Sequence, residues 1–250
     1  AAPADSGIWA ATIGRWSSSL IIAIGVFAVA RNFPRYGFPW PLAVGCGFID
    51  ASANGISIVN FGMGSPNAAT VMDLLGAIHP KGVLFLGKCG GLKKTTEIGH
   101  FILPIAAIRG EGTGDDYFPP EVPALPSFKL HKFVSDKIVA HGLDYRTGVI
   151  YTTNRRVWEH EPGFHEKLQR LRVIGIDMET ATLFLVGHAN EIPRGALLLV
   201  SDVPVTPDGV KTEDSDKKVT AEWVEKHLEI GIEAMTDLGQ KGEQIKHFRY

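Results

Sequence analysis

Cysteine is scarce in this sequence, which has 250 residues and only Cys46 and Cys89. Two isolated cysteines make no disulfide framework and no zinc pattern. The nine histidines are dispersed, without an HExxH motif. We therefore expect no metal, no cofactor and a reducing, intracellular setting, which we take to be the cytoplasm.

An excess of charge is also lacking, because the formal net charge is only −2 and the basic residues are scattered. Proteins that bind nucleic acids usually have a cluster of Lys and Arg residues, and this sequence shows no such cluster. The apolar run at residues 20–30 imitates a signal peptide, but a bilayer span needs roughly 20 apolar residues. We interpret the run as a buried strand and turn, and expect neither nucleic acid nor a membrane among the partners.

What the sequence does have is a composition of 45% hydrophobic and 21% charged residues. This suits one large α/β domain or two small ones. There are no internal repeats. The first predicted secondary-structure element is a strand at residues 17–24, followed by a tight turn at Gly25.

The most informative stretch is residues 173–204. It predicts a strand at 173–176, a helix at 180–190 and a second strand at 196–200 that runs into Ser201 and Asp202. In open α/β sheets the ligand crevice lies outside the carboxyl ends of the strands. Glu179 and Asp202 are therefore candidates for two acids that face one site. Taken singly, Asp177 or Glu179 could cap the helix, and Asp202 could be a turn residue.

Two glycine-rich segments also follow predicted strands. Residues 62–65, Gly-Met-Gly-Ser, follow a strand at 55–61 and enter a helix, where free N–H groups can bind anions. Residues 87–92 follow a strand at 82–86 and are interpreted as a second turn. Lys88 in that turn either provides a point charge for phosphate or extends outward into solvent.

Further along, strands are predicted at 101–108 and 145–151, and the polar loop after Ile108 is long enough to be functional. Arg155 and Arg156 stand beside Trp158, which suits either an interface or a pocket for a flat base and an anion. Residues 206–216 form a candidate lid, and 219–238 a long amphipathic helix.

These motifs carry a resemblance. Residues 176–182, Ile-Asp-Met-Glu-Thr-Ala-Thr, with the later Leu-Val-Ser-Asp, resemble the signature pair of the nucleoside phosphorylase and nucleosidase superfamily. From about Asn54 onward the resemblance narrows to the AMP nucleosidase family, whereas residues 1–40 match poorly. It implies an α/β fold: one domain over 1–250 with a central mixed, twisted β-sheet flanked by helices. With 250 residues, the chain looks like that family's catalytic domain alone, or a naturally short form.

The resemblance also implies site residues. Asp202 becomes the general acid that protonates N7 of the purine. The ribose-binding residues are Met178, Glu179 and Met63. The base-binding residues are Trp158, Ser201, Cys89, Gly90 and Asn154. The phosphate-binding residues are Lys88, Arg109, Arg155, Arg156 and Gly25.

The implied reaction is hydrolysis of AMP to adenine and ribose 5-phosphate. The alternative enzyme is a purine nucleoside phosphorylase that uses inorganic phosphate. A non-enzymatic alternative is a catalytically silent nucleotide-binding module. The implied partners are AMP, phosphate or nucleotide effectors, and other copies of the chain in a hexamer built from dimers.

Overall fold

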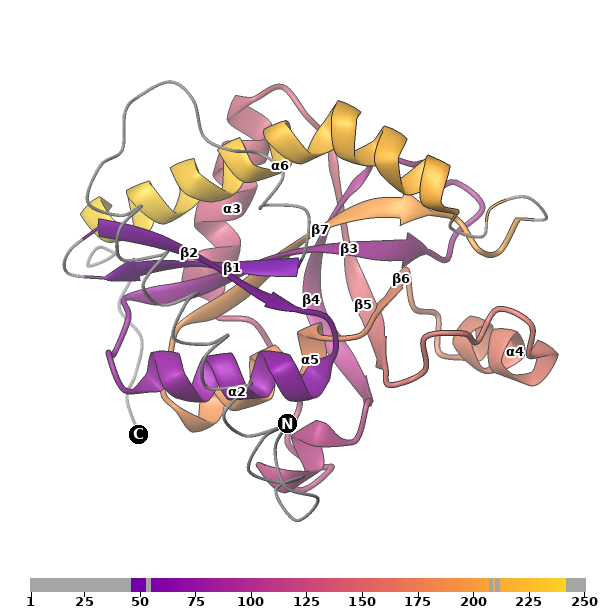
Figure 1. The fold of residues 1–250 in the computed structure, drawn as a ribbon, viewed down its shortest axis with the longest axis horizontal. Helices are drawn as coiled ribbons and strands as arrows, with labels where there is room; N and C mark the ends of the chain where they lie inside the picture. The colour runs from indigo at the N-terminus through magenta and orange to yellow at the C-terminus, as the bar shows by residue number, and fades with distance from the viewer. Residues whose placement is uncertain (1–45, 53–54, 207–208, 210–211, 242–250) are drawn as a thin grey trace, which may run out of the picture. The chain divides into compact units, whose positions relative to one another are not determined.

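The computed structural model describes residues 46–52, 55–206, 209 and 212–241 (Figure 1). The predicted strand at 17–24, the apolar run at 20–30, Gly25 and part of the candidate lid lie outside these residues. The prediction of one domain over 1–250 therefore stays a prediction. No helix among the described residues combines the length and apolarity that a bilayer crossing requires.

Seven strands in the described residues form one mixed sheet in the order β2-β1-β3-β6-β5-β4-β7. They are β1 (Cys46–Ser52), β2 (Gly55–Gly62), β3 (Gly82–Gly91), β4 (Phe101–Gly110), β5 (Tyr145–Thr153), β6 (Gly175–Asp177) and β7 (Arg194–Asp202). β3 runs parallel to β7 and antiparallel to β6, and β7 also pairs with β4. The sheet therefore closes on itself, which the sequence did not predict, while the predicted α/β class with a mixed sheet is confirmed.

Helices cover both faces of the sheet. They are α2 (Ser65–Gly76), α3 (Phe128–Ala140), α4 (Pro162–Arg170), α5 (Thr180–Ala189) and α6 (Glu213–Lys241), with the short 3-10 helix η3 (Thr113–Asp116). Figure 1 shows α3 and α6 above the sheet and α2 and α5 below it. The sequence did not predict α4, which lies at the edge of the sheet.

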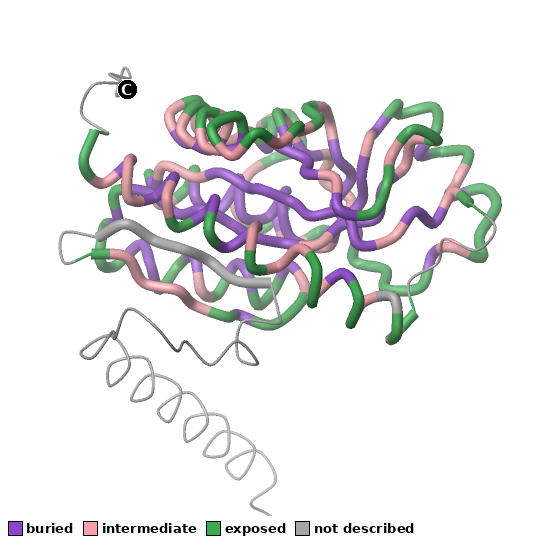
Figure 2. Tube along the Cα trace, turned by 90° about the horizontal axis from the view of Figure 1, so that it is seen from above, coloured by how far each residue is buried: buried purple, intermediate pink, exposed green. Residues whose placement is uncertain are grey.

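The pattern of β3 explains this layering. Val83 and Phe85 point into the core cluster shared with α2 and α5, whereas Leu84 and Leu86 point into the cluster shared with α3 and α6. A strand buried on both faces reads as a continuous apolar run rather than an alternating one. Figure 2 accordingly shows the central strands buried between exposed helix surfaces.

Two strands depart from their predicted bounds. β3 continues to Gly91, so the turn predicted to begin at Gly87 is wrong. Its glycines allow close packing instead, since a Cβ at Gly87 would lie 2.4 Å from the Phe85 ring and one at Gly91 would lie 2.4 Å from Thr96. β6 contains only residues 175–177, fewer than the four predicted at 173–176.

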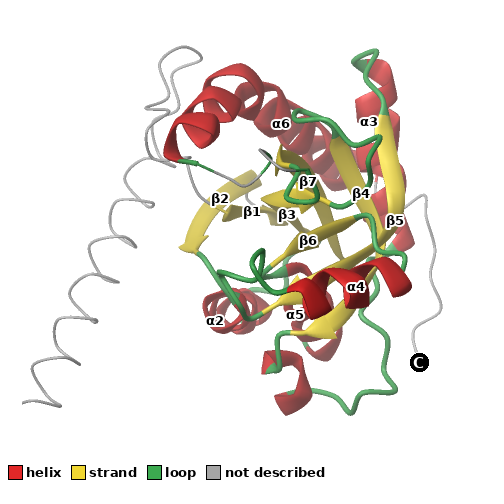
Figure 3. Cartoon of the chain, turned by 90° about the vertical axis from the view of Figure 1, so that its right-hand side faces the viewer, coloured by secondary structure: helices red, strands yellow, loops and turns green. Residues whose placement is uncertain are grey.

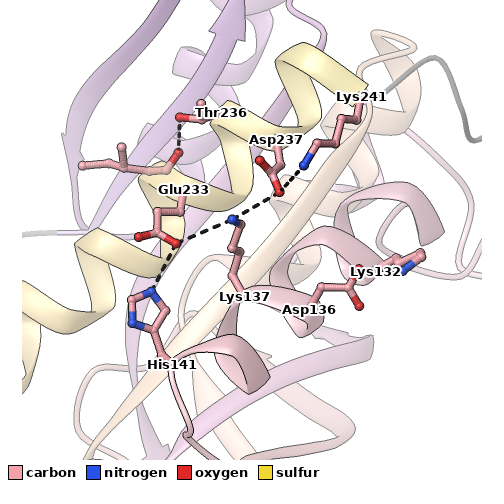
Figure 4. Close-up of polar contacts among 9 residues, drawn as sticks. Lys132, Asp136, Lys137, His141, Glu233, Thr236, Asp237 and Lys241 are labelled. Atoms are coloured by element: carbon pink, nitrogen blue, oxygen red, sulfur yellow. Dashed lines mark hydrogen bonds and ion pairs between the residues drawn. The ribbon is translucent and has the colours of Figure 1, made fainter.

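A charged network holds α6 against α3 (Figure 4). Lys137 of α3 lies 3.2 Å from Asp237 and 3.6 Å from Glu233 of α6, and His141 lies 3.2 Å from Glu233. The hydrogen bond to Asp237 is the main reason that the pKa of Lys137 is raised. The network fixes α6 across one face of the sheet, and the first turn of α6 then lies near the carboxyl end of β3.

Candidate active site

The carboxyl ends of β3 and β7 lie side by side and face the viewer in Figure 3, and the short strand β6 pairs with the end of β3 in the opposite direction. Gly90 of β3 pairs with Ile176 of β6 and with Asp202 of β7, and a bulge between Cys89 and Gly90 shifts the register there. Bulges redirect side chains and are frequent beside active sites. Asp202, the last residue of β7, thus lies close to the segment that leads from Ile176 to Glu179.

Asp202 lies directly against the backbone of Gly90. A Cβ at Gly90 would be 3.2 Å from Asp202 Oδ2 and 3.2 Å from Ile176 Cγ2. The Ser201 hydroxyl donates to Asp202 Oδ1 over 2.7 Å, with the Cys89 carbonyl as a longer acceptor at 3.4 Å. The structure therefore brings together four predicted residues: Cys89, Gly90, Ser201 and Asp202. The Cys89 side chain itself is buried in the core cluster under α2 and α5.

Glu179 lies where the starts of α2 and α5 meet. Its Oε1 accepts the backbone N–H of Gly64 at 2.7 Å, and its Oε2 accepts that of Met178 at 3.1 Å. The Ser65 hydroxyl donates to the Met178 carbonyl at 2.7 Å. These contacts place the predicted ribose residues Met178, Glu179 and Met63 in one cluster, in which Met63 is 57% exposed.

The glycine turn before α2 has a conformational reason. Gly62 and Gly64 have φ values of 83° and 94°, in the region that glycine tolerates best. The predicted turn into a helix is confirmed, and α2 begins at Ser65, two residues before the start predicted near Asn67. The turn can therefore present the Gly64 N–H to Glu179.

Asp177 is the residue that caps α5. Its Oδ2 accepts the Thr180 N–H at 2.9 Å and also bonds the Thr180 hydroxyl, and its Oδ1 accepts the Thr152 hydroxyl at 2.8 Å. Glu179 makes no side-chain cap to the helix. The capping alternative therefore holds for Asp177 and not for Glu179. Thr152, which sequence reasoning missed, also accepts the Ala181 N–H at 2.9 Å and so links β5, β6 and α5.

Both acids resist ionisation. Burial raises the pKa of Asp177 to about 6, against the lowering effect of its hydrogen bonds from Thr180 and Thr152. Burial and, to a lesser extent, the charge of Asp177 together raise the pKa of Glu179 to about 7. Asp177 accepts more hydrogen bonds and thus bears the negative charge better. Glu179 is the member of the pair that holds a proton nearest to neutral pH.

Lys88 lies within β3, so its interpretation as a turn residue is wrong. It follows Leu84 and Leu86 on the face covered by α6. Its Nζ lies 2.7 Å from Asp216 Oδ1 and 2.8 Å from Thr220 Oγ1. Lys88 thus connects the end of β3 to the first turns of α6. Its predicted contact with phosphate stays a prediction.

Arg109 is occupied by its own loop. Its guanidinium bonds Asp115 at 2.7 Å and the carbonyls of Pro119, Phe118 and Val122 at 2.6, 2.6 and 3.2 Å. These four bonds use all the donors of its two terminal nitrogens. A phosphate would have to displace part of this arrangement, so a structural role fits Arg109 better than the predicted phosphate contact.

A pocket of about 360 Å³ lies between the ends of β4 and β5 and helix α4. It contains the predicted residues Asn154 and Arg155. Its lining is completed by Gly110, Tyr151, Thr153, Glu161, Gly163, Phe164 and Lys167. Lys167 is a cation that sequence reasoning missed, and its only signal was its place on the polar side of an unpredicted helix.

The remaining predicted residues lie outside the lining of this pocket. Trp158 is only 5% exposed, and its ring packs against Phe164 at 5.6 Å and His165 at 5.3 Å. A base can stack on this indole only if its neighbours move, so base stacking stays a prediction. Arg156 is exposed, and Gly25 lies outside the described residues.

One group of side chains in the described residues has the composition of a metal site. The ligand atoms of His141, Glu229 and Glu233 lie within 4.8 Å of one another. Lys226 already lies 2.6 Å from Glu229 and 3.4 Å from His141, and Lys137 pairs with Glu233. Because lysines neutralise both carboxylates, the group stabilises the contact of α3 with α6 without needing an ion.

Comparison with known proteins places this geometry in context. The profile of the family described as "Phosphorylase superfamily" matches residues 48–236. AMP nucleosidase of Escherichia coli is 32% identical over 206 residues, which are 79% of this chain but 42% of the relative. The chain thus spans less than half the length of that curated relative.

Two solved structures extend the comparison. The crystal structure of AMP nucleosidase from Bacteroides thetaiotaomicron is 49% identical, with a TM-score of 0.65, covering 78% of this chain and 76% of that one. A uridine phosphorylase from Vibrio fischeri has a TM-score of 0.66 at 21% identity, covering 76% of this chain and 78% of that one. At that identity the second likeness concerns the fold alone.

Proposed function

This chain belongs to the phosphorylase superfamily and, within it, to the AMP nucleosidase family, and from that premise we propose that it hydrolyses the N-glycosidic bond of AMP. The products are adenine and ribose 5-phosphate. The 49% identity to the Bacteroides enzyme carries the proposal. The meeting of the Asp202 and Glu179 segments at Gly90 supports it, since cleavage needs an acid near the base and a carboxylate near the sugar.

Asp202 is the proposed general acid. Breaking the bond builds positive charge on the ribose and negative charge on the adenine, as in glycoside hydrolysis. A proton delivered to N7 neutralises the departing base, and water adds to C1′ of the sugar. Asp202 Oδ2 lies against Gly90, at the carboxyl ends of β3 and β7.

Glu179 and Met178 are proposed to hold the ribose. The carboxylate of Glu179 is fixed by two backbone N–H groups, and its position therefore depends on the fold rather than on other mobile side chains. A fixed, buried carboxylate suits bidentate acceptance of two vicinal hydroxyls. The exposed Met63 beside it offers an apolar contact to the sugar face.

The alternative is phosphorolysis, in which inorganic phosphate attacks C1′ in place of water. The resemblance to the superfamily implies a small hydroxyl residue at the position of Lys88. In this chain an ammonium group, paired with Asp216, stands there. This difference favours water as the nucleophile.

Adenine release tests the proposal directly. The purified protein is incubated with AMP or adenosine, with and without phosphate, and adenine, ribose 5-phosphate and ribose 1-phosphate are measured. We expect AMP to give adenine and ribose 5-phosphate without added phosphate. Phosphate-dependent ribose 1-phosphate from adenosine would establish the phosphorylase, and no product from either substrate would indicate a silent binding module.

Assembly and regulation also enter as proposals. We propose that the chain forms a hexamer built from dimers, in which a neighbour completes the site, and that phosphate or nucleotides act as effectors. Light scattering of the purified protein gives the oligomer mass. A monomer with full activity would contradict the shared site.

A further inference from the structure

Asp177 and Glu179 are two buried acids on the short turn between β6 and α5, and they are 6% and 2% exposed. The carboxylate of Glu179 accepts the Met178 N–H at 3.1 Å, within the turn. The carboxylate of Asp177 accepts the Thr180 N–H at 2.9 Å, where the turn enters the helix. Two buried negative charges repel each other strongly, because little water is present to screen them. The turn therefore bears one negative charge more easily than two.

No cation offsets this repulsion in the part of the chain that the structure describes. Neither carboxylate of the turn forms an ion pair or a hydrogen bond with a Lys, Arg or His side chain of that part. The titratable groups on the surrounding elements are themselves acidic: Asp202 at the end of β7, the buried thiol of Cys89 in β3, and Glu111, which accepts the Thr182 hydroxyl of α5 at 2.8 Å. The surroundings thus favour retention of a proton by the pair.

The hydrogen bonds decide which of the two acids keeps that proton. Asp177 accepts from the hydroxyls of Thr152 and Thr180 and from the backbone N–H groups of Glu179 and Thr180. These four donors fill the lone-pair sites of a carboxylate, so a proton on Asp177 would displace one of them. Glu179 accepts a single N–H on each oxygen and has room for a proton. Accordingly, the pKa of Glu179 is raised to about 7 and that of Asp177 only to about 6.

The proposed contact with the ribose requires the other form of Glu179. Two vicinal hydroxyls donate to an ionised carboxylate through charge-assisted hydrogen bonds. The negative charge also opposes the positive charge that builds on the ribose during cleavage. A sugar at Glu179 therefore favours loss of its proton. Because the lone pairs of Asp177 are already occupied, the proton leaves to solvent instead of moving along the turn.

We propose that Asp177 is a positioning residue whose charge keeps a proton on Glu179 until the sugar binds, so that binding of the nucleotide releases this proton to solvent. The inference rests on the proposed function for the identity of the substrate. Its consequence is an affinity for AMP that rises with pH as Glu179 ionises and levels off above neutral pH. Removal of the charge of Asp177 should move this rise to lower pH.

Calorimetry in buffers of different ionisation enthalpy counts the protons released for each AMP bound. The background chain carries Asp202→Asn, which suppresses turnover and removes a second acid from the count. At pH 6.5 we expect the release of about half a proton or more from a group with a pKa of about 7. The same chain with Glu179→Gln has no such proton and gives the baseline, including the contribution of the phosphate of AMP. In the background chain, 2′,3′-dideoxy-AMP, which lacks both hydroxyls, gives an independent baseline.

Asp177→Asn tests the role of the charge itself. Asparagine has the same shape and caps helices about as well as aspartate, so α5 should keep its start. We expect the pH midpoint of proton release to fall by on the order of one unit, and AMP to bind severalfold more tightly at pH 6 than it binds to the background chain. A merely structural role would instead weaken AMP. Asp136→Asn, on the exposed surface of α3, should change neither quantity, and thermal melting monitors folding.

Thr152→Val gives a second test in which both acids stay in place. The substitution removes one hydroxyl donor from Asp177, so Asp177 can take the proton in place of Glu179. The release at pH 6.5 should then fall toward the baseline. Thr152→Ser keeps the hydroxyl and should keep the release.

The outcomes separate this inference from the proposed reaction. Equal proton counts for the background chain and its Glu179→Gln variant would overturn the inference and leave the hydrolase proposal standing. An unchanged midpoint of release in Asp177→Asn would overturn the role of Asp177. If AMP releases the proton on binding but the chain without substitutions yields no adenine, the proposed reaction fails and the coupling of binding to proton release stands. Absence of AMP binding to the Asp202→Asn chain would overturn both.

Discussion

Gly64 donates its backbone N–H to Glu179 Oε1 over 2.7 Å, although 115 positions separate the two residues in the chain. The contact joins the glycine turn before α2 to the start of α5. It fixes the carboxylate by the backbone, and it buries that carboxylate beside Asp177. Several properties of the site depend on this one relationship.

The pH dependence of stability should reveal the buried acid. Glu179 has a folded pKa of about 7 against an ordinary 4.5, so between these values the folded state holds more protons than the unfolded state. Stability is then lost as pH rises through this window. Glu179→Gln removes this loss, and its stability relative to the unmutated chain should rise by on the order of 2–3 kcal/mol from pH 4.5 to 8.

Urea unfolding at pH 4.5, 6 and 8 measures that difference. Burial lowers the pKa of His227 to about 4, so His227 makes both proteins more stable as pH rises toward 6.5. This opposite trend is common to both and cancels in the comparison. A difference that stays constant with pH would show that Glu179 ionises normally.

Glu179→Gln should also reduce recognition of the ribose. An amide can only partly replace a carboxylate that accepts two hydroxyls. We expect the variant to discriminate less between AMP and 2′-deoxy-AMP, measured as the ratio of kcat/KM. If the ratio is unchanged in the variant, Glu179 does not contact the 2′-hydroxyl of the ribose.

Asp202→Asn should preserve the fold and AMP binding but reduce turnover by roughly 10²–10⁴-fold, the contribution of a positioned general acid. Single-turnover adenine release is the measurement. Asp136→Asn on the exposed face of α3 is the matched control. Activity within about threefold of the unmutated chain, far short of the 10²-fold minimum, would exclude Asp202 as the acid.

Lys88→Ser and Asp216→Asn separate two roles for their ion pair. If Lys88 only fastens α6 to β3, both variants should loosen the start of α6 alike, seen as faster amide exchange at residues 213–220. If Lys88 also binds phosphate, Lys88→Ser alone should raise KM for AMP, by roughly tenfold for a charge-assisted contact. Asp216→Asn would then leave that KM unchanged or lower it.

Arg109→Ala should destabilise the loop that the arginine organises. Its side chain is 10% exposed. Its removal leaves the Phe118 and Val122 carbonyls without their donor, at an expected cost of about 2–4 kcal/mol, whereas the Pro119 carbonyl still accepts the Val122 N–H. Thermal and urea unfolding report the loss. The ratio of KM for AMP to KM for adenosine should stay constant. A rise in KM for AMP alone would instead support the predicted contact between Arg109 and the phosphate.

Much of the fold could be predicted from local pattern. β7 and α5 follow from an apolar run of strand length and a helical segment ended by Pro193 and Gly195. The glycines at 62 and 64 predicted the turn because their positive φ is a property of the residue itself. The strand-end positions of Glu179 and Asp202 likewise required only the order of the elements along the chain.

Tertiary structure alone decided which side chains meet. Residues 87–91 resemble a turn because they are rich in glycine, but their pairing with β7 and β6 makes them part of a strand. Lys88 contacts Asp216 across 128 positions of the chain. Lys167 contacts Tyr151 from α4, a helix that the sequence analysis did not predict. A sequence specifies conformational preference residue by residue, whereas the partner of a charge depends on how sheet closure and helix packing bring distant segments together.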